Sequence, residues 1–168
     1  EDFMIGQTWY DYQHNGSIGK MIARDSQGGT HFVWMAGYNG QQDPRHVLYN
    51  YIDEEGNMAN DPDDHSVVDN GTRSGYCMLS IVPEGDLAAP FYHVLGHLED
   101  ESELGSAMSV DWLRGIGAFV PTYPPRMPNF DDLAWPHGDI DRRNFAHMTA
   151  TENTEGSWQR VAYWRGIP

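Results

Sequence analysis

The sequence predicts an all-β fold made of repeated strand–turn–strand units, and two observations support this. Segments that begin at Gly19, Cys77 and Trp135 follow one another at intervals of 58 residues, and each leads through a short turn into a second apolar run. Strands and turns at a fixed period are typical of repeat architectures. The chain also contains 18 Gly and 10 Pro, which favours short strands joined by turns over helices. No stretch predicts a helix longer than two turns.

The first unit covers about residues 5–60. Its third apolar run alternates, and this places Val47, Tyr49 and Tyr51 on one face of the expected strand. The turn dipeptide Asn15-Gly16 precedes the first run. Strands are expected at residues 18–24, 30–36 and 46–53.

The second and third units cover about residues 74–120 and 133–168. A proline-rich stretch at residues 121–128 separates them, and it predicts a surface loop because proline cannot donate a backbone hydrogen bond. The third unit closes with an aromatic strand that ends near Arg165. Strands of the second unit are expected at residues 76–82, 87–94 and 107–113.

Three to four strands per unit favour the blades of a β-propeller over a β-sandwich, which gives no reason for an internal period. Closed propellers use roughly four to eight blades. Three blades would leave two apolar faces uncovered. The sequence therefore predicts that residues 1–168 form a single all-β repeat segment of about three four-stranded blades, an incomplete ring. Further blades would come from the same, longer chain or from an oligomer.

Composition excludes several functions. The net charge is −15, with one Lys and nine Arg, so the field of the protein repels nucleic acids and anionic membranes. No apolar run approaches the roughly 18 residues that span a bilayer. Cys77 is the one cysteine; it cannot form an intrachain disulfide, and it is expected to be a small buried apolar residue.

Three stretches carry a family resemblance. They read YDYQHNGSIGKMIARDSQGGTHFVWM with RHVLYNYID, then SGYCMLSIVPEGDLAAPFYH, then WPHGDIDRRNFAHMTATE with YWR. Together they resemble the bacterial extracellular propellers with sialidase-like or BNR-like repeats. The Asp-box of that family, Ser-x-Asp-x-Gly-x-x-Trp, is imperfect here, because Ala23 replaces its Ser and Gly28 stands one position late. The resemblance implies an extracellular or cell-surface location.

A binding or scaffolding role, for a glycan or a protein partner, fits this resemblance best. The chain is rich in aromatic side chains, whose flat faces suit sugar rings, and those next to turns are the best candidates to line a pocket. Polar residues just before a strand would add hydrogen bonds at the same rim. The predicted ligand-binding residues are Tyr38, Arg45, His46 and Trp135.

A calcium site is predicted in the acidic loop of the first unit. Asp61, Asp63 and Asp64 supply hard oxygen ligands at close spacing, the type that Ca²⁺ prefers. The loop does not follow the EF-hand pattern, because Pro62 and His65 occupy positions that the pattern reserves for other residues. No other cofactor is expected.

Two alternatives to binding remain open. A sialidase-like glycoside hydrolase would pair an arginine cluster with a tyrosine nucleophile, and one such set can be assembled from the sequence. A structural subunit of a surface assembly is the other. No catalytic residue is assigned, and His31 and His147 are expected to serve packing because they occupy equivalent repeat positions. The set for the hydrolase comprises Arg24, Arg45, Arg73 and Tyr51.

Overall fold

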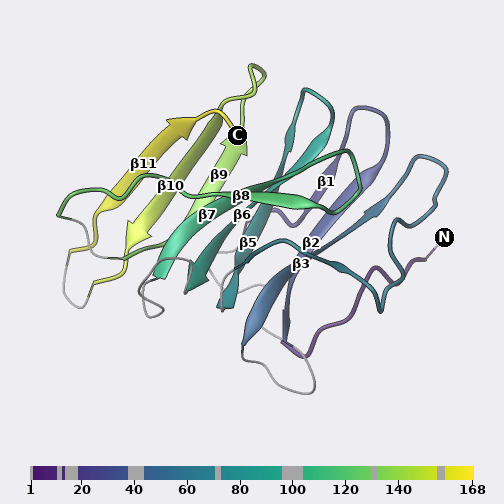
Figure 1. Ribbon diagram of the computed structural model, residues 1–168, viewed down its shortest axis with the longest axis horizontal. Helices are drawn as coiled ribbons and strands as arrows, with labels where there is room; N and C mark the ends of the chain where they lie inside the picture. Colours follow the sequence, from purple (N-terminus) through teal and green to yellow (C-terminus); the bar gives the residue numbers. More distant parts are fainter. Residues whose placement is uncertain are drawn as a thin grey trace.

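The computed structural model describes residues 2–10, 13, 19–37, 44–70, 73–95, 104–129, 132–154 and 158–168. Within these ranges the chain forms eleven strands and no helix, so none of them holds a helix that could cross a membrane. The strands make three antiparallel sheets that lie side by side (Figure 1). The all-β prediction is confirmed. None of the three sheets closes on itself in the described residues.

Sheet A contains four strands in chain order. Its third strand alternates as expected, since Val47, Tyr49 and Tyr51 enter the core that it shares with the second sheet, whereas Leu48 enters a separate cluster. The strands are β1 (Ile22–Arg24), β2 (Thr30–Gly37), β3 (Arg45–Ile52) and β4 (Ser66–Val67).

Sheet B also contains four strands in chain order. Its last strand includes Pro121, which the sequence predicted to lie in a loop. An edge strand tolerates proline because the missing N–H would have no partner strand. The strands are β5 (Arg73–Val82), β6 (Leu87–Leu95), β7 (Leu104–Asp111) and β8 (Phe119–Thr122).

Sheet C contains three strands, with β10 in the centre. The prediction of four strands per unit is therefore correct for two sheets and wrong for the third, as far as the described residues go. The closing aromatic strand of this sheet ends at Gly166. The strands are β9 (Leu133–Ile140), β10 (Ala146–Glu152) and β11 (Val161–Gly166).

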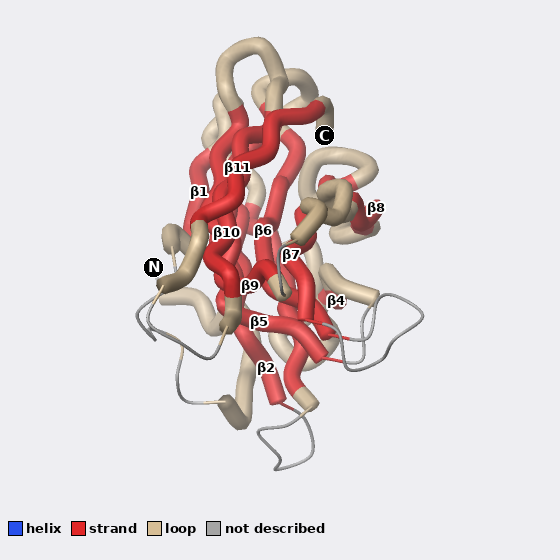
Figure 2. The backbone as a smooth tube through the Cα atoms, turned by 90° about the vertical axis from the view of Figure 1, so that its left-hand side faces the viewer, coloured by secondary structure: helices blue, strands red, loops and turns tan. Residues whose placement is uncertain are grey.

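Aspartate-led turns close three of the hairpins, and Figure 2 shows loops gathered at one end of the strands. In each turn the aspartate carboxylate accepts the N–H groups two and four residues ahead, as Asp25 does from Gln27 and Gly29. The fourth turn residue has a positive φ, which Gly and Asn tolerate best. These turns begin at Asp25, Asp53 and Asp141, and their positive φ values are 103° at Gly28, 89° at Gly56 and 62° at Asn144.

Close contacts join neighbouring sheets along their first strands. The Leu79 N–H donates to the Lys20 carbonyl at 2.7 Å, which links sheet B to the segment leading into β1. On the other side Ser80 Oγ donates to Asp139 at 2.5 Å and accepts the Ile140 N–H at 3.1 Å. Apolar side chains fill the spaces between the sheets, in one cluster between A and B and another between B and C.

The outer face of sheet A is partly covered by the N-terminal segment. The Trp34 indole donates to the Gln7 carbonyl at 3.2 Å, and the Asn50 amide donates to the Ile5 carbonyl at 2.9 Å. Gly6 lies so close to the Trp34 ring that a Cβ at this position would stand 2.2 Å from it. The apolar face that the sequence predicts to be uncovered is therefore partly covered in sheet A.

The outer face of sheet C is polar where the matching face of sheet A is apolar. The strand registers equate Val33 with Thr149 and Met35 with Thr151. They also place Arg165 where sheet A has Tyr51. The same face also carries the exposed side chains of Val161 and Tyr163, opposite Thr151 and Thr149. It is therefore more polar than the sequence predicts but still partly apolar.

Tight packing between sheets B and C makes Gly138 sensitive to substitution. A Cβ at this position would stand 2.3 Å from the buried Phe91 ring. We expect Gly138→Ala to lower the free energy of unfolding by about 1–3 kcal/mol. Gly166→Ala is the control, because nothing lies within 4 Å of a Cβ there, and it should change stability by less than about 0.5 kcal/mol. Urea unfolding of both variants measures the difference; equal stabilities would contradict the packing described.

Candidate functional site

A cavity of about 340 Å³ lies at the end of the strands opposite the aspartate turns, and residues of all three sheets line it. Sheet A contributes one arginine from the start of β3, and sheet B contributes residues of β5 and β6. Residues at the start of β9 and just after β10 complete the lining. The polar and aromatic side chains concerned are Arg45, Arg73, Tyr76, His93, Asp132, Trp135 and Asn153, which follows β10.

Arg45 is the buried cation of this cavity, with 4 % of its surface exposed. Its guanidinium carbon lies 4.9 Å from the centre of the Tyr10 ring and 5.2 Å from that of Tyr76. Such cation–π contacts stabilise a desolvated guanidinium. Its Nη2 donates to Nε2 of His93 at 3.4 Å. These contacts fix the position of the positive charge on the cavity wall.

His93 places a buried polar atom at the same wall. The residue is 5 % exposed. An arginine can only donate, so Nε2 of His93 accepts and the ring proton lies on Nδ1. Nδ1 is buried and has no hydrogen-bond partner among the described residues. A buried donor without an acceptor costs about 1–3 kcal/mol, which is the kind of cost that functional sites carry.

Burial, together with the positive charges of Arg45 and Arg73, lowers the pKa of His93 to about 3. The imidazole is therefore neutral at pH 7. A neutral ring keeps Nε2 as an acceptor for Arg45 and Nδ1 as a donor. His93 thus adds a directed N–H, and no charge, to a site that already holds two arginines.

Two aromatic residues of the lining have a strained backbone. Tyr76 has φ 47° and Trp135 has φ 52°, a region that bulky residues rarely occupy. Each lies where the pairing of its strand with the next one shifts register, between Gly75 and Met78 in sheet B and opposite Thr149–Thr151 in sheet C. Bulges of this kind re-aim side chains and are frequent beside functional sites.

The cavity combines two guanidinium groups, a directed imidazole N–H and two aromatic rings. Asp132 supplies the opposite charge, and one of its oxygens accepts the Leu104 N–H at 3.3 Å. Guanidinium groups bind carboxylates and phosphates through paired hydrogen bonds, and aromatic faces accept the apolar faces of rings. The arrangement suits a ligand that joins an anionic group to a ring.

Of the four predicted ligand-binding residues, Arg45 and Trp135 line this cavity. Tyr38 lies outside the described residues. His46 is bound instead to Asp69, with Nδ1 at 2.9 Å from Oδ1, and this hydrogen bond raises the pKa of His46. The alternation of β3 turns neighbouring side chains to opposite faces, which separates His46 from Arg45.

Tyr76 and His93 were not among the predicted site residues. A signal for Tyr76 existed in the sequence, because Tyr76 and Trp135 are 59 residues apart, one more than the period. Tyr76 and Trp135 thus lie at equivalent bulges of sheets B and C, one residue away from the exact period. No sequence pattern predicted that β6 would bring His93 beside Arg45.

The predicted calcium residues form a turn. The Asp63 N–H donates to Asp61 Oδ1 at 3.0 Å, and the Asp64 N–H donates to the Asp61 carbonyl at 2.9 Å. The Asp63 carboxylate accepts a hydrogen bond from Gln7. Across the described ranges, no three His, Cys, Asp or Glu side chains converge as metal ligands would. The calcium site stays a prediction.

The residues of the hydrolase alternative are divided between the two ends of the strands. Arg45 and Arg73 lie together at the cavity. Tyr51 lies at the other end, where its hydroxyl donates to Asp25 at 3.2 Å. Arg24 ends β1 beside the same aspartate. Among the described residues, Tyr76 is the tyrosine that lines this cavity with the two arginines.

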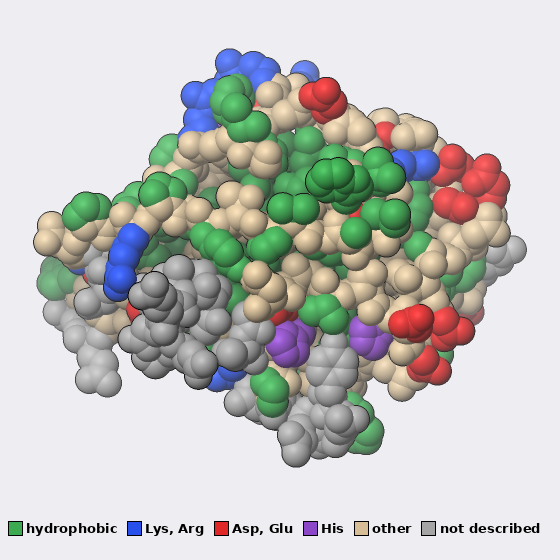
Figure 3. All heavy atoms as spheres, in the orientation of Figure 1, with side chains coloured by type: hydrophobic (Ala, Val, Ile, Leu, Met, Phe, Trp, Pro, Cys, Tyr) green, Lys and Arg blue, Asp and Glu red, His purple; other side chains and the backbone are tan. Residues whose placement is uncertain are grey.

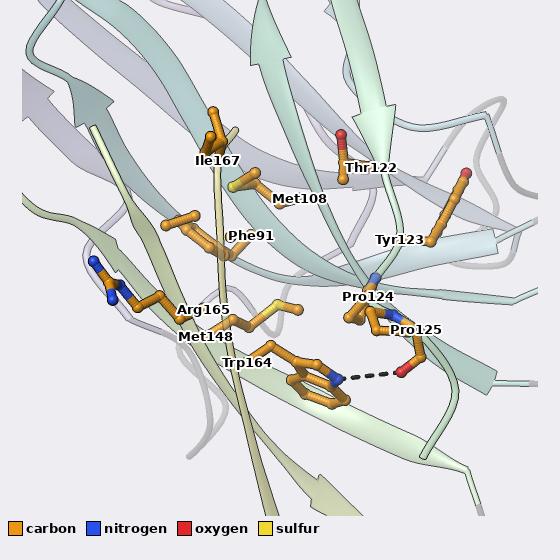
Figure 4. Close-up of a pocket in the computed structure, with 12 residues that line it drawn as sticks. Phe91, Met108, Thr122, Tyr123, Pro124, Pro125, Met148, Trp164, Arg165 and Ile167 are labelled. Carbon is orange, nitrogen blue, oxygen red and sulfur yellow. Dashed lines mark hydrogen bonds between the residues drawn. The ribbon is translucent and has the colours of Figure 1, made fainter. Parts of the chain in front are cut away.

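A second, smaller hollow of about 170 Å³ lies between sheets B and C (Figure 4). Phe91, Met108 and Met148 form its apolar floor, and Pro124 and Trp164 border it. The Trp164 indole donates to the Pro125 carbonyl at 3.2 Å, which ties the loop after β8 to β11. With a nearly all-apolar lining, this hollow offers few groups that could select a polar ligand.

Comparison with known proteins identifies no relative. No protein-family model matches the chain, and a search of curated proteins finds no match. The sialidase-like resemblance therefore remains a prediction that depends on short sequence motifs.

Proposed function

We propose that this protein is an extracellular binding module, in which propeller-like blades hold a site for a glycan that carries an anionic group. The side-by-side packing of three antiparallel sheets, with their first strands adjacent, supports the propeller-like arrangement. The observation that carries the binding role is the cavity where Arg45, Arg73 and His93 meet beside Tyr76 and Trp135.

The chemistry of the lining explains the choice of ligand. A carboxylate on the ligand would accept hydrogen bonds from the guanidinium groups of the lining. A sugar ring would lie against Trp135. A neutral glycan would offer these guanidinium groups no opposite charge, so acidic glycans should bind more tightly.

The test is binding of the intact protein to an array of acidic and neutral glycans. We expect retention of acidic glycans, and at least tenfold weaker binding by Arg73→Met, because each lost charge-assisted pair removes a strong hydrogen bond. Arg143→Met is the matched control, since Arg143 lies in the exposed β9–β10 turn and should leave binding unchanged. Absence of glycan binding, or equal effects of the two variants, would refute the proposal.

A sialidase-like hydrolase is the second candidate, and the meeting of Arg45, Arg73 and Tyr76 at one cavity favours it. Release of the terminal acidic sugar, measured by chromatography of the reaction mixture, distinguishes it from a binding module. Turnover that disappears in Tyr76→Phe would replace the binding-only proposal. Binding without release would retain it.

A further inference from the structure

The loop between β7 and β8 carries large apolar side chains on its outer side. Trp112 is 70 % exposed, Leu113 56 % and Ile116 53 %. Figure 3 shows hydrophobic side chains gathered over this loop and β8, with acidic side chains beside them. Isolated exposed apolar residues are ordinary, but a contiguous group on one loop marks an interaction site.

Hydrogen bonds on the inner side of the loop hold it against the rest of the protein. The Asp111 carboxylate accepts the Gly117 N–H at 3.1 Å and the Ala118 N–H at 3.0 Å. Arg114 turns inward, where it donates to Asp25 at 2.7 Å and to Glu54 at 2.7 Å. The loop therefore directs its charged residue into the protein and its apolar residues outward.

Gly115 lets the backbone of the loop rest directly on the Tyr51 ring. Its φ is 72°, and a Cβ at this position would stand 2.3 Å from that ring. The backbone that carries the exposed side chains is thus held in place before any partner arrives. A partner that binds preordered side chains loses less conformational entropy in doing so.

A groove of about 360 Å³ runs beside this loop, between Leu113 and Ile116 on one side and Met58 and Ala59 on the other. Asp53 lines the groove. Hydrogen bonds from Asn57 lower the pKa of Asp53, so its carboxylate is ionised at pH 7. The next turn residues, Glu54 and Glu55, are also acidic and exposed. Arg114 also lines the groove, where it is paired with Asp25 and Glu54. Asp53 and Glu55 therefore leave the rim of this groove with a net negative charge.

We propose that this loop and groove bind a polypeptide segment in which large apolar side chains alternate with Lys or Arg. The apolar side chains would fill the groove beside Trp112, and the basic ones would face Asp53 and its neighbours. Charge complementarity favours a basic polypeptide over a second copy of the chain or an anionic membrane. A second copy of the chain would bring another rim of the same sign, and the net charge of −15 repels anionic membranes.

This surface is separate from the glycan cavity. Strand β7 begins at the cavity with Leu104 and ends at the loop with Asp111. Seven residue steps at 3.3 Å each separate the two by about 23 Å. The proposal therefore does not depend on the function proposed above, and either can fail without the other.

Selection of a phage-displayed library of random peptides on the immobilised intact protein tests the proposal. The selected peptides should combine large apolar residues with Lys or Arg. Their affinity, measured by fluorescence anisotropy, should fall at least tenfold for Trp112→Ser, because buried tryptophans dominate such interfaces. It should also fall for Asp53→Asn. Trp158→Ser is the matched control, since Trp158 is 87 % exposed elsewhere on the surface, and it should bind as the unchanged protein does.

Several results would overturn the proposal. One is a selection that yields no binder, or binders whose affinity survives Trp112→Ser. Another is binding to phosphatidylcholine vesicles that Trp112→Ser abolishes, which would assign the loop to a membrane. A concentration-dependent dimer that Trp112→Ser dissociates would assign it to a second copy. Thermal unfolding of Trp112→Ser checks that the variant is folded, which is expected because the indole makes none of the anchoring contacts.

Discussion

Asp25→Ala is expected to lower the free energy of unfolding by about 3–5 kcal/mol, the range found when one partner of a buried ion pair is removed. The Asp25 side chain is fully buried where sheets A and B meet. Arg114 reaches it from sheet B, with Nε at 2.7 Å from Oδ2 and Nη2 at 3.2 Å from Oδ1. The substitution would leave the guanidinium with Glu54 as its remaining carboxylate in the described structure.

Further donors on the same carboxylate increase the effect. His31 Nε2 lies 3.2 Å from Asp25 Oδ2, and His31 Nδ1 lies 2.7 Å from the Tyr49 hydroxyl. Tyr49 thus donates to His31, and His31 donates to Asp25. This series of hydrogen bonds joins the same residue types as some catalytic sites do, but all three side chains are buried in the core between two sheets. All three residues lie in sheet A or in its β1–β2 turn, so these hydrogen bonds hold Asp25 in place for its contact with Arg114 of sheet B.

Sheet C provides a matched control for this prediction. Asp141, His147 and Tyr163 repeat the same series of hydrogen bonds, with His147 at 3.4 Å from Asp141 and 2.8 Å from the Tyr163 hydroxyl. That copy is partly exposed, and no arginine of another sheet reaches it in the described residues. Asp141→Ala should therefore have a much smaller effect than Asp25→Ala. Equal losses in urea unfolding would show that the arginine contributes nothing.

The stabilisation by Asp25 should disappear in acid. Burial by itself would raise the pKa of Asp25, but hydrogen bonds from Arg114 and Gly29 and the charge of Arg114 outweigh it, and the pKa is lowered. The folded state thus releases this proton more readily than the unfolded state, whose aspartates titrate near pH 4. The contribution is complete above that pH and is lost as the pH falls below it.

Much of the fold could be predicted from the sequence because the repeat is local. The alternation of Val47, Tyr49 and Tyr51 and the period of 58 residues predicted the strands and the turns between them. The outer faces could not be predicted from the same pattern. Covering sheet A required Gly6 and Gln7 to lie against Trp34, a contact between segments that share no periodicity.

Part of the candidate site could also be predicted, because some of its residues are marked by local features of the sequence. Arg45 and Trp135 were found because they stand next to turns, whereas His93 was missed because its role depends on a partner 48 residues away. The β7–β8 loop was missed too. Its apolar side chains predict burial, and only the inward turn of Arg114 onto Asp25 keeps them exposed.

His93→Phe is expected to reduce the sensitivity of the fold to acid. The pKa of His93 is lowered to about 3, first by burial and then by Arg45 and Arg73, whereas an unfolded histidine titrates near 6.5. Between these values the unfolded state binds one proton more than the folded state, so stability falls by about 1.4 kcal/mol for each pH unit lost. At pH 4 the accumulated loss is about 3 kcal/mol. The His93→Phe variant should not show this loss of stability.

Urea unfolding from pH 8 to pH 4 measures the difference between the two proteins. Above pH 7 the imidazole is neutral in both states, so the two stability curves should run parallel, offset by the hydrogen bond that Phe cannot offer to Arg45. Below pH 6 they should converge and then cross, because only the protein with His93 continues to lose stability from this residue. Curves that stay parallel down to pH 4 would mean that His93 takes up its proton in the folded state. Protonation would then remove Nε2 as the acceptor for Arg45, and the wall of the cavity would have to accommodate a third positive charge at mildly acidic pH.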